Sequence, residues 1–218
     1  MKSLEEYKLV IWDLDGTLYF QQEFRVKMAM VLLRNLILRP VKWKELVVIL
    51  KYRQIREKWD ASDSGADLEM RQYAETALRC RMKTEEVRRI IICWMHEEPL
   101  KHLLPYRDED AVELMNALQK QGILNVVYSD YPTIDKLNAL NIKVKDSFAA
   151  SDKEIGCMKP NPKGIEYILQ KYEIHKKDAI MIGDRLEKDG EAAIAAGIDY
   201  LILRRKRKER MKQQKSVC

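Results

Sequence analysis

The stretch Lys8-Leu9-Val10-Ile11-Trp12-Asp13-Leu14-Asp15-Gly16-Thr17 begins as a short apolar run and ends in two acidic residues and a glycine. The run is rich in strand-forming residues and has the length of a strand that is buried on both faces. Asp13 follows at once, so the strand would carry this carboxylate at its carboxyl end. Four similar apolar runs follow, at residues 123–128, 147–150, 179–182 and 200–203.

Helical patterns lie between these runs. They cover residues 108–121, which Gly122 closes, 133–140, 162–172, and 188–196, which Gly197 closes. Strands that alternate with helices predict an α/β fold, with a parallel sheet covered by helices on both faces.

Residues 20–98 interrupt this alternation, because they have helical periodicity and no convincing strand. We expect four helices there, at residues 23–38, 41–59, 67–81 and 85–96. The predicted organisation is therefore a core domain of residues 1–18 and 99–218, with an inserted helical domain of residues 19–98. Residues 21–58 hold ten basic and three acidic residues. Such a face can attract an anion, but a solvated face opposite an apolar stripe is the simpler interpretation.

The 218 residues are 46% hydrophobic and 34% charged, which fits a globular protein with a real core. No apolar run approaches the roughly 20 residues of a membrane span, and the first six residues lack the apolar stretch of a signal peptide. The four cysteines are scattered without metal-ligand spacing, which favours reduced thiols. We therefore expect a cytoplasmic protein, with a monomer as the default.

The net charge of +6 is concentrated at one end of the chain. Residues 204–215 hold eight Lys or Arg and one Glu, so the rest of the chain sums to −1. This tail has neither aromatic residues nor apolar periodicity. A solvated or helical extension is thus preferred over a patch that binds nucleic acid or acidic lipid.

Polar residues stand at or just beyond the carboxyl ends of the predicted strands, where open parallel sheets bind ligands. Asp13 and Asp15 lie two apart, and Gly16 permits the chain to turn, so both carboxylates can face one cavity. A divalent cation would relieve their repulsion, and Mg²⁺ prefers such oxygen ligands. One carboxylate could attack phosphorus while the other protonates the leaving oxygen and later activates water.

The other strand ends supply complementary groups. Ser129 offers a hydroxyl and a backbone amide to a phosphate oxygen, and Lys159 offers a positive charge. Asp184 could bind the cation, with Asp189 steadying its water shell. Each of these strand-end segments is a weak signal alone, but the four segments in this order predict a phosphate site.

These segments resemble the four motifs of the haloacid dehalogenase superfamily of hydrolases over nearly the whole chain. Asp13-Leu14-Asp15-Gly16-Thr17-Leu18 resembles the first motif and Ser129 the second. Lys159, in Met158-Lys159-Pro160, resembles the third, and Gly183-Asp184 with Asp189 resembles the fourth.

The resemblance implies a Rossmann-like three-layer core and a helical cap of the family's first type, inserted after the first motif. It implies Asp13 as nucleophile and Asp15 as acid and base. Mg²⁺ would be held by Asp13, Asp184 and the backbone carbonyl of Asp15, with Asp189 in the second shell. Dehalogenase members lack a carboxylate at the position of Asp15, and ion-pumping members carry threonine there, so the aspartate indicates turnover of a phosphoenzyme.

The expected function is Mg²⁺-dependent hydrolysis of a small phosphorylated metabolite, a phosphomonoester, through an aspartyl phosphate on Asp13. A sugar phosphomutase or other phosphotransferase would use the same nucleophile. A third alternative is a nucleic-acid- or anion-binding protein that uses the basic tail, and this is the least favoured of the three.

Some residues depart from the motif pattern or lie outside it. Asp130-Tyr131-Pro132 follows Ser129 where many relatives have asparagine and a small or basic residue, and Gly190 after Asp189 is also unusual. Tyr19 and Phe20 could line the substrate entrance or serve as hinge residues. We expect structural or solvent-facing roles for the three histidines, and packing between helices for three tryptophans: His96, His102, His175, Trp43, Trp59 and Trp94.

Overall fold

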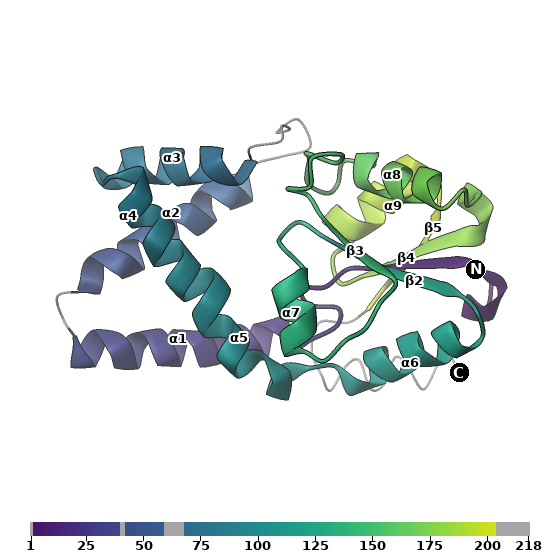
Figure 1. Ribbon diagram of the computed structural model, residues 1–218, viewed down its shortest axis with the longest axis horizontal. Helices are drawn as coiled ribbons and strands as arrows, with labels where there is room; N and C mark the ends of the chain where they lie inside the picture. Colours follow the sequence, from purple (N-terminus) through teal and green to yellow (C-terminus); the bar gives the residue numbers. More distant parts are fainter. Residues whose placement is uncertain (1, 40–41, 59–67, 204–218) are drawn as a thin grey trace.

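The computed structural model describes residues 2–39, 42–58 and 68–203 (Figure 1). Its centre is a sheet of five parallel strands in the order β3-β2-β1-β4-β5, which confirms the predicted α/β fold. The strands are Leu9–Trp12 (β1), Leu124–Ser129 (β2), Asp146–Ala149 (β3), Ala179–Gly183 (β4) and Asp199–Ile202 (β5).

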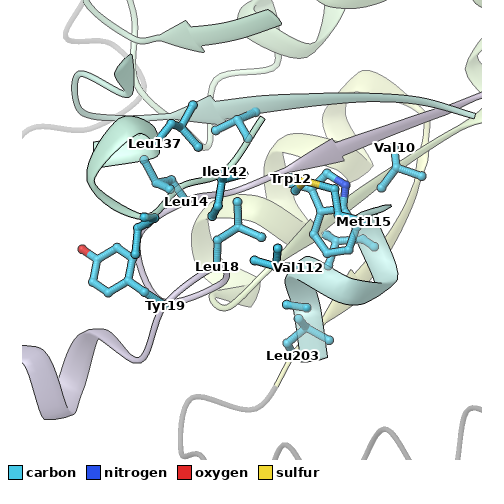
Figure 2. Close-up of a cluster of buried hydrophobic side chains, with 14 of the residues drawn as sticks. Val10, Trp12, Leu14, Leu18, Tyr19, Val112, Met115, Leu137, Ile142 and Leu203 are labelled. Atoms are coloured by element: carbon cyan, nitrogen blue, oxygen red, sulfur yellow. The ribbon is translucent and has the colours of Figure 1, made fainter. Parts of the chain in front are cut away.

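Helices cover both faces of the sheet (Figure 1). Side chains of a strand alternate between faces, so Val10 and Trp12 pack on one side of β1, and Leu9 and Ile11 on the other. Figure 2 shows the first side, where Trp12 lies beside Met115. The helices on this side are α6 (Glu109–Lys120) and α7 (Ile134–Ala139), and those on the other are α8 (Lys163–Lys171) and α9 (Glu191–Ala196).

The helix ends follow from local chemistry. The Asp108 carboxylate accepts the backbone N–H of Ala111 at 3.0 Å and so caps the start of α6. Gly122 follows α6 with φ +84°, and Gly197 follows α9 with φ +76°. Both glycines therefore end their helices in the left-handed conformation, as predicted.

A helical region lies beside the sheet and has its own core (Figure 1). The predicted helices are present, with one difference. The run predicted at residues 85–96 is an α-helix followed by a π-helix, and a further helix continues to Leu103, with Pro99 accommodated in its first turn. The elements are α1 (Gln21–Leu38), α2 (Trp43–Lys58), α3 (Leu68–Cys80), α4 (Thr84–Ile91), the π-helix Ile92–Glu97 and α5 (Glu98–Leu103).

The tryptophans of this region behave differently from one another. Trp94 is buried and donates its indole N–H to Glu45 of α2 at 2.7 Å, which agrees with the predicted packing between helices. Trp43 is 57% exposed, so the packing role predicted for it is wrong. Trp59 and the basic tail, residues 204–215, lie outside the described residues.

The helical region also contacts the sheet domain directly. Ile55 of α2 forms a small buried cluster with Ala150, after β3, and Met158, next to Lys159. Within the described ranges, no helix is both long enough and apolar enough to cross a membrane.

Candidate active site

The predicted site residues meet at the carboxyl ends of β1, β2 and β4. Strand order reverses direction between β1 and β4, and such a switch point opens a crevice at the strand ends. Asp13 follows β1 and donates its backbone N–H to the carbonyl of Ile182 in β4 at 2.8 Å. Asp184 follows β4, and the two neighbouring strands therefore bring two distant motifs together.

Lys159 lies at the centre of the site. Its side chain is 1% exposed, and its Nζ lies 2.5 Å from Asp13 Oδ1 and 2.6 Å from Asp189 Oδ1. The same Nζ lies 3.3 Å from the carbonyl oxygen of Tyr128 in β2. A buried ammonium thus bridges the first and fourth motifs and satisfies two buried carboxylates.

Three carboxylates form a cluster that fits a divalent cation. Asp13, Asp184 and Asp189 each offer an oxygen, and these atoms lie within 4.8 Å of one another. A Cβ at Gly16 would lie 2.4 Å from Asp184 Oδ2, so only glycine leaves room for this carboxylate. The ligand set consists of hard oxygens, which suits Mg²⁺ better than a soft metal.

Asp189 is held at both of its carboxylate oxygens. Its Oδ2 accepts the backbone N–H groups of Asp184 at 3.1 Å and of Arg185 at 3.0 Å, while its Oδ1 faces Lys159. A Cβ at Gly183 would come within 2.3 Å of the Asp189 carboxyl carbon. Such an anchored carboxylate is suited to orient a water shell or a ligand rather than to react.

Asp15 is held by a separate set of groups. Lys136 Nζ lies 2.6 Å and 2.8 Å from its two carboxylate oxygens, and Ser129 Oγ donates to Oδ2 at 3.2 Å. The hydroxyl of Tyr19 donates to Oδ1. Asp15 therefore points toward β2 and α7, away from the cluster of the other three carboxylates, and stays adjacent to Ser129.

Burial and charge separate the two carboxyl groups of the first motif. Burial, together with the negative charges around it, raises the pKa of Asp13 well above its usual value despite Lys159. Burial alone would also raise the pKa of Asp15, but the attraction of Lys136 and three hydrogen bonds leave it lowered. The pKa values of the two carboxyl groups are therefore shifted in opposite directions, and Asp15 is the more acidic of the two.

Asp130, which directly follows Ser129, faces groups of the protein itself. Its Oδ1 accepts the backbone N–H of Lys159 at 2.8 Å, and its Oδ2 lies 4.0 Å from a guanidinium nitrogen of Arg185. Ser129 Oγ in turn accepts the N–H of Tyr131 at 3.2 Å. The unusual carboxylate therefore binds protein groups of the third and fourth motifs.

The sequence named the six site residues and missed one neighbour. The structure brings together Asp13, Lys159, Asp184 and Asp189, and places Asp15 with Ser129 beside them. Lys136 carried no motif signal, because only the packing of α7 directs it toward Asp15. The histidines stay outside this group; His96 and His102 face Glu69 and Glu98 of the helical region.

Comparison with known families gives one match of long extent. The family model described as haloacid dehalogenase-like hydrolase matches residues 7–197. This span contains all six site residues. A comparison with curated protein sequences gives no match.

Solved structures with the same fold include enzymes of different named activities. The 2-haloacid dehalogenase of Pseudomonas syringae pv. Tomato DC3000 is 17% identical with a TM-score of 0.62, covering 90% of this chain and 86% of that one. The putative HAD-hydrolase YfnB of Bacillus subtilis, bound to magnesium, is 15% identical (TM-score 0.61, 91% and 87% covered). A predicted phosphoglycolate phosphatase of Haemophilus somnus 129pt is 21% identical with a TM-score of 0.58, covering 91% of this chain and 85% of that one. At these identities the likeness shows the shared fold.

Proposed function

Because the chain belongs to the haloacid dehalogenase-like hydrolases, we propose that it hydrolyses a small phosphomonoester with Mg²⁺ through an aspartyl phosphate on Asp13. The observation that carries this proposal is the second carboxylate, Asp15, held beside Ser129 by Lys136. An alkoxide leaving group needs a proton, whereas a halide does not. A positioned acid therefore favours phosphate-ester chemistry over dehalogenation.

The reaction has two steps in this proposal. A carboxylate oxygen of Asp13 attacks phosphorus, the P–O bond to the leaving group breaks, and Asp15 gives its proton to the leaving oxygen. Water then attacks the phosphorus of the aspartyl phosphate, Asp15 takes a proton from that water, and the Asp13 carboxylate and phosphate are released. The negative charge of a bound phosphate would raise the pKa of Asp15 and so favour the protonated form that the first step needs.

The other side chains would bind and orient the phosphoryl group. Lys159 and the hydroxyl of Ser129 would contact its oxygens, whose charge is spread during transfer. Mg²⁺, held by Asp13, Asp184 and the Asp15 carbonyl, would supply charge neutralisation at a phosphoryl oxygen. The anchored Asp189 would order the surroundings of that ion. The helical insertion, residues 19–98, would act as a cap of the first type that excludes bulk water.

The test uses p-nitrophenyl phosphate with and without Mg²⁺. The wild-type protein should release phosphate only with the ion, and Asp13→Asn should abolish this release. Asp178→Asn is a matched control, because this carboxylate pairs with Lys8 at the surface away from the site. Circular dichroism checks that each variant is folded.

Two results would overturn the proposal. Retained phosphate release by folded Asp13→Asn would exclude Asp13 as nucleophile. Release of chloride from 2-chloropropionate, without hydrolysis of any phosphomonoester in a panel of sugar phosphates, nucleotides and phosphorylated acids, would show that the reaction is dehalogenation.

A further inference from the structure

Asp130 has no part in the proposed reaction, yet it is buried and bonded at both of its ends. Its carboxylate accepts the backbone N–H of Lys159 at 2.8 Å. Its backbone carbonyl accepts a hydrogen bond from the Arg56 guanidinium, which comes from α2 of the helical region. One residue, directly after Ser129, therefore joins the helical region to the third motif.

Arg56 is held in place for this contact. Its side chain is 7% exposed, and Nη1 donates to the Gln72 side-chain oxygen at 3.2 Å. Gln72 is fully buried on α3 and donates its own amide to the carbonyl of Tyr52 at 2.9 Å. The guanidinium is therefore oriented by the Gln72 side chain of α3, which is itself held by a backbone carbonyl of α2.

The Arg56 guanidinium also lies over the ring of Tyr131, 4.9 Å from its centroid, and Lys136 Nζ lies 5.3 Å from the same centroid. Two cations, one from the helical region and one from the core, thus meet at this ring. The N–H of Tyr131 donates to Ser129 Oγ at 3.2 Å. The loop that Arg56 contacts is therefore bonded to Ser129 as well as to Lys159.

The residue before Arg56 reinforces this docking. Ile55 is buried against Ala150 and Met158, and Met158 immediately precedes Lys159. A polar contact at Asp130 and an apolar contact at Met158 thus bring adjacent residues of α2 against the loop that follows Ser129 and the loop that carries Lys159. Movement of α2 away from the core would break both contacts together.

We propose that Asp130 is a positioning residue, through which Arg56 of the helical region sets the places of Ser129 and Lys159. This inference rests on the proposed function for the role of those two residues in binding phosphate. Affinity for phosphate then depends on whether the helical region is docked. The loop is ordered for binding only when Arg56 donates its hydrogen bond to the Asp130 carbonyl. The Asp130 carboxylate then positions Lys159 through the hydrogen bond that it accepts from the Lys159 backbone N–H.

The experiment compares full-length Arg56→Met with Arg89→Met, which removes an exposed arginine from α4 of the same region. Hydrogen–deuterium exchange should rise in Arg56→Met in the segments around Tyr131 and Lys159, and not in Arg89→Met. Titration calorimetry with orthophosphate in the presence of Mg²⁺ should give a Kd roughly tenfold weaker for Arg56→Met. Arg56→Lys, which keeps the charge and one donor, should lie between the two and provides a folded variant should the methionine unfold the region.

A second pair of variants tests the carboxylate itself. Asp130→Ala removes the acceptor for the Lys159 N–H and should weaken orthophosphate binding to a similar degree. Asp130→Asn keeps a side-chain oxygen at that place and should restore most of the affinity. If Asp130 had a purely structural role, both variants would lose thermal stability, and Asp130→Asn would bind orthophosphate no better than Asp130→Ala.

The outcomes separate the two proposals. Unchanged exchange in the 130–131 and 159 segments of Arg56→Met overturns the positioning role, and so does raised exchange with unchanged orthophosphate affinity. In both cases a wild-type protein that hydrolyses p-nitrophenyl phosphate leaves the proposed function standing. A folded wild-type protein that neither binds orthophosphate nor hydrolyses any ester overturns both proposals at their common premise.

Discussion

Replacement of Lys159 by methionine should destabilise the protein strongly when Mg²⁺ is absent. The ammonium is 1% exposed and lies 2.5 Å from Asp13 and 2.6 Å from Asp189. Without it, the cluster of Asp13, Asp184 and Asp189 keeps three buried carboxyls and loses its central cation. Loss of one partner of a buried ion pair costs about 3–5 kcal/mol, and we expect the free energy of unfolding to fall by that amount.

The assay is urea unfolding with a chelator, followed by circular dichroism and repeated with excess Mg²⁺. The ion should recover more stability in Lys159→Met than in the wild type, because it replaces the missing charge; saturation at about a hundred times Kd contributes about 2.7 kcal/mol. Lys8→Met is the matched control, since the Lys8 side chain is 68% exposed in its pair with Asp178, and ion pairs with a solvated partner contribute little. A loss in Lys159→Met no larger than in Lys8→Met would refute the reasoning.

The same variant should respond to pH with a definite sign. Burial already raises the pKa of Asp13 in the folded protein, and removal of Lys159 takes away the attraction that opposes this rise. The folded state then holds a proton that the unfolded state has released, so the stability of Lys159→Met should fall as pH rises from the ordinary pKa of an aspartate toward neutral pH. A flat profile over this range would contradict the assigned electrostatics.

Three further results are expected. Lys136→Met should raise the pKa of Asp15, since it removes the attraction that opposes burial; the acid limb of the kcat–pH profile should then move to higher pH, and Lys136→Arg should move it back. His96 has a pKa lowered by burial, so the unfolded state takes up a proton first and stability should fall as pH drops below about 6.5; His96→Gln should flatten that part of the urea-midpoint profile. Gly164→Ala would place a Cβ 2.3 Å from the ring of Tyr128, so thermal unfolding should show a loss of about 1–3 kcal/mol with little change in kcat.

The parallel sheet was predictable because the composition of each strand reflects its burial. A strand buried on both faces must be apolar throughout, and β1 is buried at all four of its residues. Local sequence also predicts where helices of the core begin and end. Asp108 caps the start of α6, and the left-handed glycines Gly122 and Gly197 end α6 and α9. The continuation of the helical segment beyond His96, into α5, was not predicted, because a proline in a first helical turn resembles a helix break in sequence.

The sequence by itself determined which groups stand at the strand ends, since a strand, a carboxylate and a turn-permitting Gly16 are all local features. It placed Asp13, Asp15, Ser129, Lys159 and Asp184 in one site, because the strands of a parallel sheet end on one edge. Tertiary structure alone decided how these groups divide between two neighbourhoods. Lys159 faces the cluster of acidic residues because its buried side chain reaches Asp13, after β1, and Asp189, beyond β4. Lys136 holds Asp15 because α7 packs beside β2, and Arg56 reaches Asp130 because α2 docks on the core. Contacts between residues so far apart in the chain leave no local pattern, since their energy depends on packing and burial that only the folded molecule creates.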